Sequence, residues 1–458
     1  MRHPAAAAGV AIRWGTLFAA LLSSTALGQS VGTGGRWPEC TIQIVGSKEI
    51  VAATSLQAKR SVANNVQQGT GPPNIARIDC LPGTETAQVT LTGGMGFAGF
   101  ADNFTGVDFT QDDTLPGAIL KMEGQNLVIR DSTFSNIAHG APATLIVINS
   151  TLSITNTTFA SNTQAAAGAL FLNGSSVTIY DSLFDRNKGF QAGAINAIGQ
   201  SNLLVNLTVF RSNNGSQGGG IGMQGGGQLR VVESLFLRNT AQNGGGIFVQ
   251  KSADAVIHNC TFSSNTAAVN GAGVFQELTR GTLDACILRA NKAQTGGGGY
   301  YNKCPDVSFV HNRFENNTAN AGGAGLELNQ CVGDVSFCVF SGNRGEKGGG
   351  LFMDQCATNV ANSTFESNSA TLLGGGLYRS FPSERSVVRG CKFIKNKAAQ
   401  YGGAIYEQNV ADGAVQGSKF SGNESPTGAA IYSRMSSTDV TANQNLDSAD
   451  VESCAQNP

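Results

Sequence analysis

The sequence predicts an all-β fold, a single-stranded right-handed parallel β-helix of about 12 to 13 coils with an N-terminal cap, where a coil is one turn of the solenoid. Three observations predict this fold class. A Phe-x-x-Asn motif returns every 25 to 28 residues, apolar and polar residues alternate before it, and Gly-rich corners follow it. The period carries no helical pattern, so it indicates stacked units of β-structure.

The first position of the motif, called the anchor below, is almost always Phe. One copy is "FLRNTAQNGGGIF", from Phe236 to Phe248: anchor, two residues, Asn, a polar stretch, Gly residues and an aliphatic. We expect the anchors to form one interior stack, because each coil can pair only with the same segment one coil away, roughly 4.8 Å along the axis. The anchors are Phe109, Phe134, Phe159, Phe184, Phe210, Phe236, Phe262, Leu288, Phe314, Phe340, Phe365, Phe393 and Phe420.

A strand is expected before each anchor. "VTIYDSLF" and "LRVVESLF" place an aliphatic residue five positions before Phe184 and Phe236, and a Ser two positions before them. Such alternation is typical of a strand with one face on a core. A β-propeller would need longer repeats with polar hairpins, and leucine-rich repeats would need Leu-x-Leu spacing, so the sequence favours neither.

Asn follows most anchors by three residues, and we predict that these Asn side chains form a ladder at a turn. Asn tolerates left-handed backbone angles, and its amide can donate to the amide oxygen of the Asn one coil on. The predicted ladder residues are Asn162, Asn187, Asn213, Asn239, Asn265, Asn291, Asn317, Asn343, Asn368, Asn396 and Asn423.

The pattern divides the chain into four regions: a signal peptide at 1–28, an N-terminal cap region at 29–106, β-helix repeats at 107–433 and a polar C-terminal tail at 434–458. The first region combines early basic residues, a short apolar run and small residues, which favours a cleaved signal peptide over a signal anchor. After cleavage we expect no transmembrane segment, and a secreted protein that stays extracellular or associates with the cell surface or wall.

Ten Asn-x-Ser/Thr sequons and ten cysteines fit a secretory route. We predict that Cys40 and Cys80 bridge within the cap, and that two of Cys304, Cys331 and Cys356, which recur in consecutive coils, bridge between coils. Asn423 is expected to stay unmodified because it belongs to the ladder. The glycosylation candidates are Asn103, Asn149, Asn156, Asn173, Asn206, Asn214, Asn259, Asn316 and Asn362.

The paired F-x-x-N and G-G-A-[ILV] motifs resemble the repeats of the chlamydial polymorphic membrane proteins. Examples are "FDRN" with "AGAI" between Phe184 and Ile195, and "FIKN" with "GGAI" between Phe393 and Ile405. The resemblance spans residues 109 to 431 and implies a passenger-like β-helix on a cell surface, acting in adhesion. A secreted or wall-associated eukaryotic protein with the same repeat is equally consistent with it.

The sequence favours a noncatalytic repeat protein, adhesin-like or part of an extracellular matrix, that binds extracellular polysaccharide or a surface protein as a monomer. The net charge of −1 argues against nucleic acid as a partner. The alternative is a carbohydrate-active enzyme on the same scaffold, a pectin or polyuronate lyase, hydrolase or esterase, with Asp112, Asp113 and His139 as weak catalytic candidates. Pairs of Cys-x-x-Cys and the Gly-Gly-x-Gly-x-Asp nonapeptide are missing, so no metal and no cofactor is expected.

Overall fold

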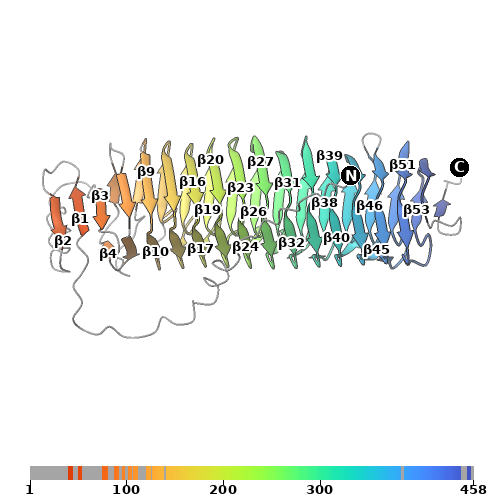
Figure 1. Cartoon of the computed structure of the whole chain (residues 1–458), viewed down its shortest axis with the longest axis horizontal. Coiled ribbons are helices and arrows are strands. Elements are labelled where there is room, and N and C mark those ends of the chain that lie inside the picture. Colours follow the sequence, from red (N-terminus) through yellow and green to blue (C-terminus); the bar gives the residue numbers. More distant parts are fainter. Residues whose placement is uncertain are drawn as a thin grey trace, which may run out of the picture. The chain divides into compact units, whose positions relative to one another are not determined.

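The computed structural model describes residues 126–138, 141–382 and 386–444, together with Gly124 and the backbone of the strands β1 to β8 and β55. These elements belong to the compact unit Pro38–Pro458. All of them are strands, and they stack along one axis (Figure 1). The predicted right-handed parallel β-helix is therefore confirmed. No helix among the described residues is long and apolar enough to span a bilayer.

The coils run through strands that we call sheets A, B and C in chain order, and nine of them add a short strand of sheet D between B and C. Sheet A has 17 strands. They are β1 (Cys40–Ile44), β2 (Ile50–Ala53), β3 (Ile75–Cys80), β6 (Asp102–Thr105), β9 (Asn126–Arg130), β12 (Thr151–Thr155), β16 (Ser176–Tyr180), β20 (Asn202–Asn206), β23 (Gln228–Val232), β27 (Asp254–His258), β31 (Arg280–Asp284), β35 (Val307–Val310), β39 (Val332–Ser336), β43 (Ala357–Ala361), β47 (Val387–Arg389), β51 (Gly413–Gln416) and β54 (Thr438–Thr441).

Sheet B carries the anchors and has 14 strands. They are β4 (Ala87–Leu91), β7 (Val107–Gln111), β10 (Thr133–Ser135), β13 (Thr158–Ala160), β17 (Leu183–Asp185), β21 (Val209–Arg211), β24 (Leu235–Leu237), β28 (Thr261–Ser263), β32 (Ile287–Arg289), β36 (Arg313–Glu315), β40 (Val339–Ser341), β44 (Thr364–Glu366), β48 (Lys392–Ile394) and β52 (Lys419–Ser421).

Sheet C closes each coil and has 15 strands. They are β5 (Met95–Phe97), β8 (Leu120–Glu123), β11 (Leu145–Ile148), β15 (Leu170–Asn173), β19 (Ile195–Ile198), β22 (Ile221–Gln224), β26 (Ile247–Gln250), β30 (Val274–Glu277), β34 (Gly299–Asn302), β38 (Leu326–Asn329), β42 (Leu351–Asp354), β46 (Leu377–Ser380), β50 (Ile405–Gln408), β53 (Ile431–Arg434) and β55 (Val451–Cys454).

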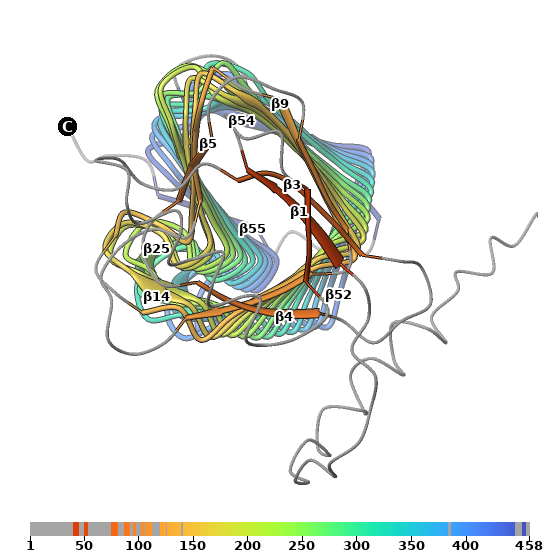
Figure 2. The same ribbon diagram turned by 90° about the vertical axis from the view of Figure 1, so that its left-hand side faces the viewer.

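Sheet D is a set of short strands that the sequence did not predict. It forms from the polar stretch between the ladder Asn and the Gly residues, in two pieces of two and seven strands. Figure 2 shows β14 and β25 in a lobe beside the tube of sheets A, B and C. The strands are β14 (Thr163–Gln164), β18 (Lys188–Gly189), β25 (Thr240–Asn243), β29 (Thr266–Asn270), β33 (Lys292–Ala293), β37 (Thr318–Ala319), β41 (Arg344–Lys347), β45 (Ser369–Leu373) and β49 (Lys397–Ala398).

The core is a set of in-register columns, one side chain per coil. Phe210 and Phe236 stack with ring centroids 4.7 Å apart and planes 4° apart, and both are fully buried. Leu288 fills the same column between Phe262 and Phe314. Burying each such side chain contributes roughly 1.5–3 kcal/mol relative to leaving it exposed.

The Gly residues that follow sheet D allow the lobe to return to the tube. Gly244 has a φ of +64°, which L side chains rarely adopt. A Cβ on Gly246 would lie 2.5 Å from the carbonyl oxygen of Gly273 and 2.8 Å from the Phe262 ring. The chain therefore passes too close to its neighbours for any side chain at this corner.

Asn side chains form a ladder at the corner between sheets B and D. The backbone N–H and Nδ2 of Asn213 both donate to Oδ1 of Asn239, each at 3.0 Å. Nδ2 of Asn213 also donates to the carbonyl of Phe184 at 2.9 Å. The same three bonds recur from Asn162 through Asn396, and the last member, Asn423, donates to the carbonyl of Phe393.

The corner between sheets A and B and the corner between sheets C and A carry ladders in which small side chains accept hydrogen bonds. The ladder between sheets C and A corrects the prediction of a disulfide between coils. Cys304, Cys331 and Cys356 are buried free thiols, so no disulfide joins them. Cys331 N–H donates to Sγ of Cys356 at 3.4 Å, as Ser175 N–H donates to Oγ of Ser201 at 3.2 Å. In-register coils hold these side chains parallel, roughly one strand spacing of 4.8 Å apart, whereas a disulfide needs Cβ atoms about 3.8 Å apart.

The parallel stack extends beyond both predicted boundaries. β4 pairs in parallel with β7, with Val89 opposite the anchor Phe109, so stacking begins before residue 107 without the Phe-x-x-Asn motif. At the other end β54 and β55 pair in parallel with β51 and β53 inside the predicted tail, because backbone hydrogen bonds need no particular side chain. Within the predicted cap region, β1 pairs antiparallel with β2 and β3 and places Cys40 opposite Cys80. The side chains of these two cysteines lie outside the described residues.

Near the C-terminal end the core becomes charged. Arg379 and Glu407 are 1% and 0% exposed and occupy the column that holds Met353 one coil earlier. Arg379 Nε donates to Glu407 Oε1 at 2.8 Å, and the hydroxyls of Ser433 and Thr438 donate to Oε2 at 3.0 and 2.6 Å. This pairing satisfies both ions and makes the last coils a distinct part of the stack.

Candidate functional site

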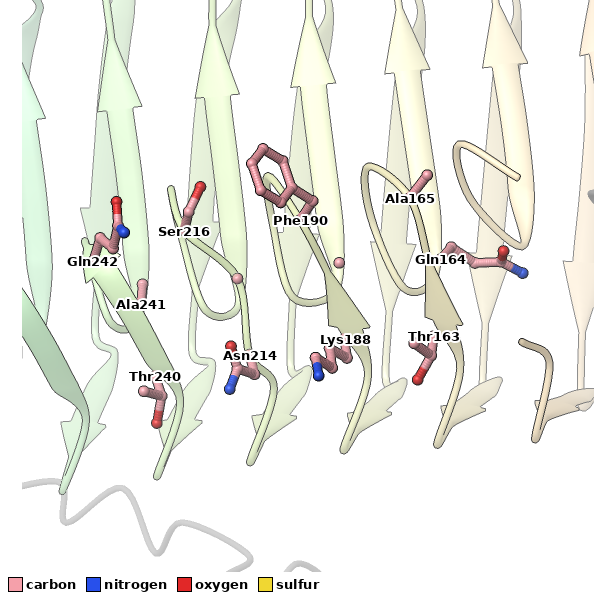
Figure 3. Close-up of a pocket in the computed structure, with 12 residues that line it drawn as sticks. Thr163, Gln164, Ala165, Lys188, Phe190, Asn214, Ser216, Thr240, Ala241 and Gln242 are labelled. Atoms are coloured by element: carbon pink, nitrogen blue, oxygen red, sulfur yellow. The ribbon is translucent and has the colours of Figure 1, made fainter. Parts of the chain in front are cut away.

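A groove runs along sheet D over four successive coils (Figure 3). It has a volume of about 510 Å³ and is lined by the equivalent residues of each coil: 163–165, 188–190, 214–216 and 240–242. Thr163, Lys188, Asn214 and Thr240 lie in one row, because each pairs in register with the next. The groove is therefore a surface that the repeat itself generates along the solenoid axis.

Gly residues form the floor of the groove. A Cβ on Gly215 would lie 2.5 Å from the backbone nitrogen of Gly193, and Gly189 is equally crowded by the carbonyls of Ala166 and Ala192. These contacts lie inside the lobe, where Gln164 and Ala241 take the equivalent buried position in the first and last of the four coils. The two Gly residues therefore let the chain pack closely under the groove.

Phe190 projects from this groove (Figure 3). Its side chain is 79% exposed, the largest exposure of any large apolar side chain in the described part of the chain. The flanking coils carry Ala165 and Ser216 at the equivalent position, so the ring has no stacking partner from its own column. A solvated aromatic ring in a polar groove offers an apolar face to a ligand.

Gln164 lies at one end of the groove. It is 5% exposed, and neither its Nε2 nor its Oε1 has a hydrogen-bond partner among the described residues. Its side chain points along the axis toward the preceding coil and away from the rest of the groove (Figure 3).

The groove holds one ionisable side chain, Lys188, among its lining residues. Nearby, Asp185 is 3% exposed and accepts from Arg211 Nε and Nη2 at 2.8 and 2.9 Å, and its Oδ2 lies 3.1 Å from Arg186 Nε. The hydrogen bond that Arg211 donates to Asp185 is the main cause of the raised pKa of Arg211. The lining therefore provides hydroxyls, amides, one cation and one ring, which suits recognition of a polar polymer.

Two histidines and a carboxylate come together on another corner. Nδ1 of His258 lies 3.0 Å from Oδ2 of Asp284, and Nδ1 of His311 lies 3.6 Å from Oδ1 of the same residue. His311 also stacks on Phe337, with ring centroids 5.4 Å apart. In the part of the chain that the structure describes, no group of three His, Cys, Asp or Glu side chains is placed to hold a metal ion. No motif in the sequence brings these two histidines together.

Glu327 is a buried carboxyl that no sequence motif marks. It is 5% exposed, and its Oε2 accepts from the backbone N–H groups of Gly296 and Gly323 at 3.1 and 3.0 Å. Burial raises its pKa to about 7, although the hydrogen bonds to the carboxylate act in the opposite direction. It lies in the column between Tyr300 and Phe352, where a protonated carboxyl is easier to bury than a charged one.

The remaining predicted residues fall in three groups. Asp112, Asp113 and His139 lie outside the described residues, as does the side chain of Asn103. Asn423 is half-buried with its amide in the ladder. Among the other sequons, Asn173 and Asn206 are half-buried, and the exposed ones are Asn149, Asn156, Asn214, Asn259, Asn316 and Asn362.

Comparison with known proteins agrees with this architecture. A family model described as "right handed beta helix region" matches residues 104–243, 167–322 and 310–446. No curated protein matches the chain.

Proposed function

The chain belongs to the right-handed β-helix family, and from this premise we propose that it is a noncatalytic, adhesin-like or matrix-associated repeat protein outside the cell. Its ligand is an extracellular polysaccharide or a surface protein, which lies along the groove over sheet D. The observation that carries the proposal is the exposed Phe190 ring in an open groove of hydroxyl and amide side chains.

Two features of the groove support binding without turnover. Glycoside hydrolysis uses a pair of carboxylates that flank one substrate bond, and the groove lining holds Lys188 but no Asp or Glu. Each of the four coils contributes the same three positions to the groove, and many weak contacts along a polymer add to a useful affinity.

Phe190→Ala tests the groove directly. We expect the variant to bind a polysaccharide or cell-surface ligand roughly 3- to 10-fold more weakly than the parent, because an aromatic stacking contact contributes about 0.5–1.5 kcal/mol. Phe337→Ala is the matched control: Phe337 is also an exposed ring, at 53%, but lies on the corner between sheets A and B. Equal affinities of the two variants would remove the groove from the proposal.

Turnover is tested separately. The purified protein is incubated with pectate, polygalacturonate, alginate and methylated pectin, with and without calcium, while unsaturated product, reducing ends and released methanol are measured. We expect none of these signals to rise. Activity that disappears in an Asp112→Ala, Asp113→Ala double variant would favour the enzyme alternative instead.

A further inference from the structure

The two residues that flank each ladder Asn alternate in charge from coil to coil. A cation flanks Asn187, Asn239, Asn291, Asn343 and Asn396, in the segments "RNK", "RNT", "ANK", "GNR" and "KNK". The coils between them carry "SNN", "SNT", "NNT" and "SNS", which hold hydroxyls and amides and no charge. Every second coil from Asn187 to Asn396 therefore presents positive charge at the corner between sheets B and D.

The structure places these residues on two neighbouring lines, because Lys188, Lys292 and Arg344 follow the ladder Asn whereas Arg238 and Lys395 precede it. The residue after each ladder Asn pairs in register with its equivalent in the next coil, as Thr266 pairs with Lys292, Lys292 with Thr318 and Thr318 with Arg344. The residue before it has a left-handed backbone, with φ of 54° at Arg238 and 52° at Lys395. Both positions project at the turn, so the cations recur every two coils, roughly 10 Å apart at a strand spacing of about 4.8 Å.

One cation in each of these coils is exposed and forms no ion pair with a described residue: Lys188, Arg238, Lys292, Arg344 and Lys395. At the opposite edge of sheet B the left-handed turn carries Asp131, Asp181 and Glu233 in the earlier coils and uncharged residues such as Asn259, Ala285 and Asn362 in the later ones, so no row of cations lies there. The chain as a whole has a net charge of −1, so these lines of cations are a local arrangement rather than a consequence of composition.

We propose that the corner between sheets B and D binds a linear polysaccharide that carries an acidic group on every second sugar. The proposal rests on the proposed function and names its ligand class. The cations on alternate coils pair with the acidic groups, and the hydroxyls and amides of the coils between them, such as Asn214, Thr266 and Thr318, bond to the neutral sugars.

The charge spacing separates this ligand from other polyanions. Double-stranded nucleic acid carries one charge per about 1.7 Å of its axis, far denser than one cation per two coils. Single-stranded nucleic acid binds on rows of aromatic side chains, whereas the groove beside this corner contributes one ring, Phe190.

The test measures binding of hyaluronan, in which acidic and neutral sugars alternate, at low and high salt. The protein is made in a host that adds no N-glycans, because Asn214 and Asn316 face the same corner. We expect Lys292→Gln with Arg344→Gln to lower the affinity roughly tenfold at low salt, since each exposed ion pair accounts for about 2- to 5-fold. The control, Lys251→Gln with Lys303→Gln, removes the same charge from the exposed corner between sheets C and A and is expected to bind like the parent.

A third variant tests the spacing. Thr266→Lys with Lys292→Thr exchanges two register partners and leaves composition and net charge unchanged. We expect it to weaken hyaluronan binding several-fold and to improve binding of polygalacturonate, which is charged on every sugar, relative to hyaluronan. If the ratio of the affinities for hyaluronan and polygalacturonate is the same in this variant as in the parent, the proposed match in charge spacing is wrong.

Other results separate this inference from the proposed function. If the Lys292/Arg344 variant and its control bind equally while Phe190→Ala loses binding, the inference fails and the groove stands. If single-stranded DNA or polyglutamate binds as tightly as hyaluronan, the assignment of a polysaccharide ligand is wrong. The same holds if the corner instead mediates salt-sensitive self-association of the protein. If the parent protein binds neither a polysaccharide nor a cell-surface ligand, both the inference and the proposed function are wrong.

Discussion

Replacement of Asn239 by Ala is the sharpest test of what holds the coils in register. Asn239 is fully buried, and its Oδ1 accepts from the backbone N–H and Nδ2 of Asn213, each at 3.0 Å. Its own Nδ2 donates to the carbonyl of Phe210 at 2.9 Å and to Oδ1 of Asn265 at 3.1 Å. Alanine removes all of these bonds at a site that bulk water does not reach.

The magnitude follows from the groups that lose a partner. The N–H of Asn213 loses its acceptor, and the carbonyl of Phe210 loses the amide donor. At roughly 1–3 kcal/mol for each unsatisfied buried group, we expect a loss of about 2–6 kcal/mol in the free energy of unfolding. Asn423→Ala is the matched control: it ends the ladder and is half-buried, so water can replace its bonds and the loss should stay near 1 kcal/mol.

Urea unfolding followed by circular dichroism measures the midpoint for both variants. A solenoid can unfold in parts, so hydrogen exchange of the Asn213 amide provides a local measure that does not assume a single transition. We expect a lower midpoint and much faster exchange in Asn239→Ala. An unchanged midpoint together with unchanged protection of the Asn213 amide would refute the idea that the ladder stabilises the stack.

Three further predictions follow from burial. Glu327 has a pKa raised from 4.5 to about 7, so its contribution to stability is full below about pH 4.5 and is lost as the pH rises through about 7; Glu327→Gln should abolish this loss, on the order of 3 kcal/mol, in unfolding midpoints measured across that range. Burial raises the pKa of Cys338 to about 12 and of Cys391 to about 11, so iodoacetamide should label neither thiol before urea unfolds the protein. Glycopeptide mapping after expression in a eukaryotic host should find Asn362 modified and Asn423 bare, because the amide of Asn423 donates to Phe393.

The fold was predictable because the same core residues recur at the same positions in repeat after repeat. A single Phe-x-x-Asn could belong to any turn, but its return at a fixed period admits only a stacked architecture in which Phe236 meets Phe262. The start of the stack was less predictable. Val89 takes the anchor position there, and an aliphatic strand without the following Asn gives no periodic signal.

The candidate site was less accessible from sequence. The cysteines recur in the correct register, but their parallel stacking, which favours thiols over a disulfide, is a property of three-dimensional geometry. Sheet D was missed because its strands are short and polar, so neither alternation nor propensity marks them. The exposure of Phe190 depends on that lobe, as does the burial of Glu327. The alternating cations are visible in the sequence, but only after each coil is aligned on its ladder Asn.

The ladder and the cations illustrate two kinds of regularity in one turn. The fold requires Asn at the buried position, because its amide must both accept and donate between coils, and so it recurs without exception from Asn162 to Asn423. The flanking positions face solvent, where Ser, Thr, Asn, Lys or Arg satisfy the backbone equally well. Packing therefore gives no reason for charge to appear on alternate coils. A rigid scaffold with a two-coil charge spacing loses little entropy on meeting a polymer of the same spacing, and exposed ion pairs too weak to matter singly then add along its length. The regularity that the fold does not need is the one that a ligand can use.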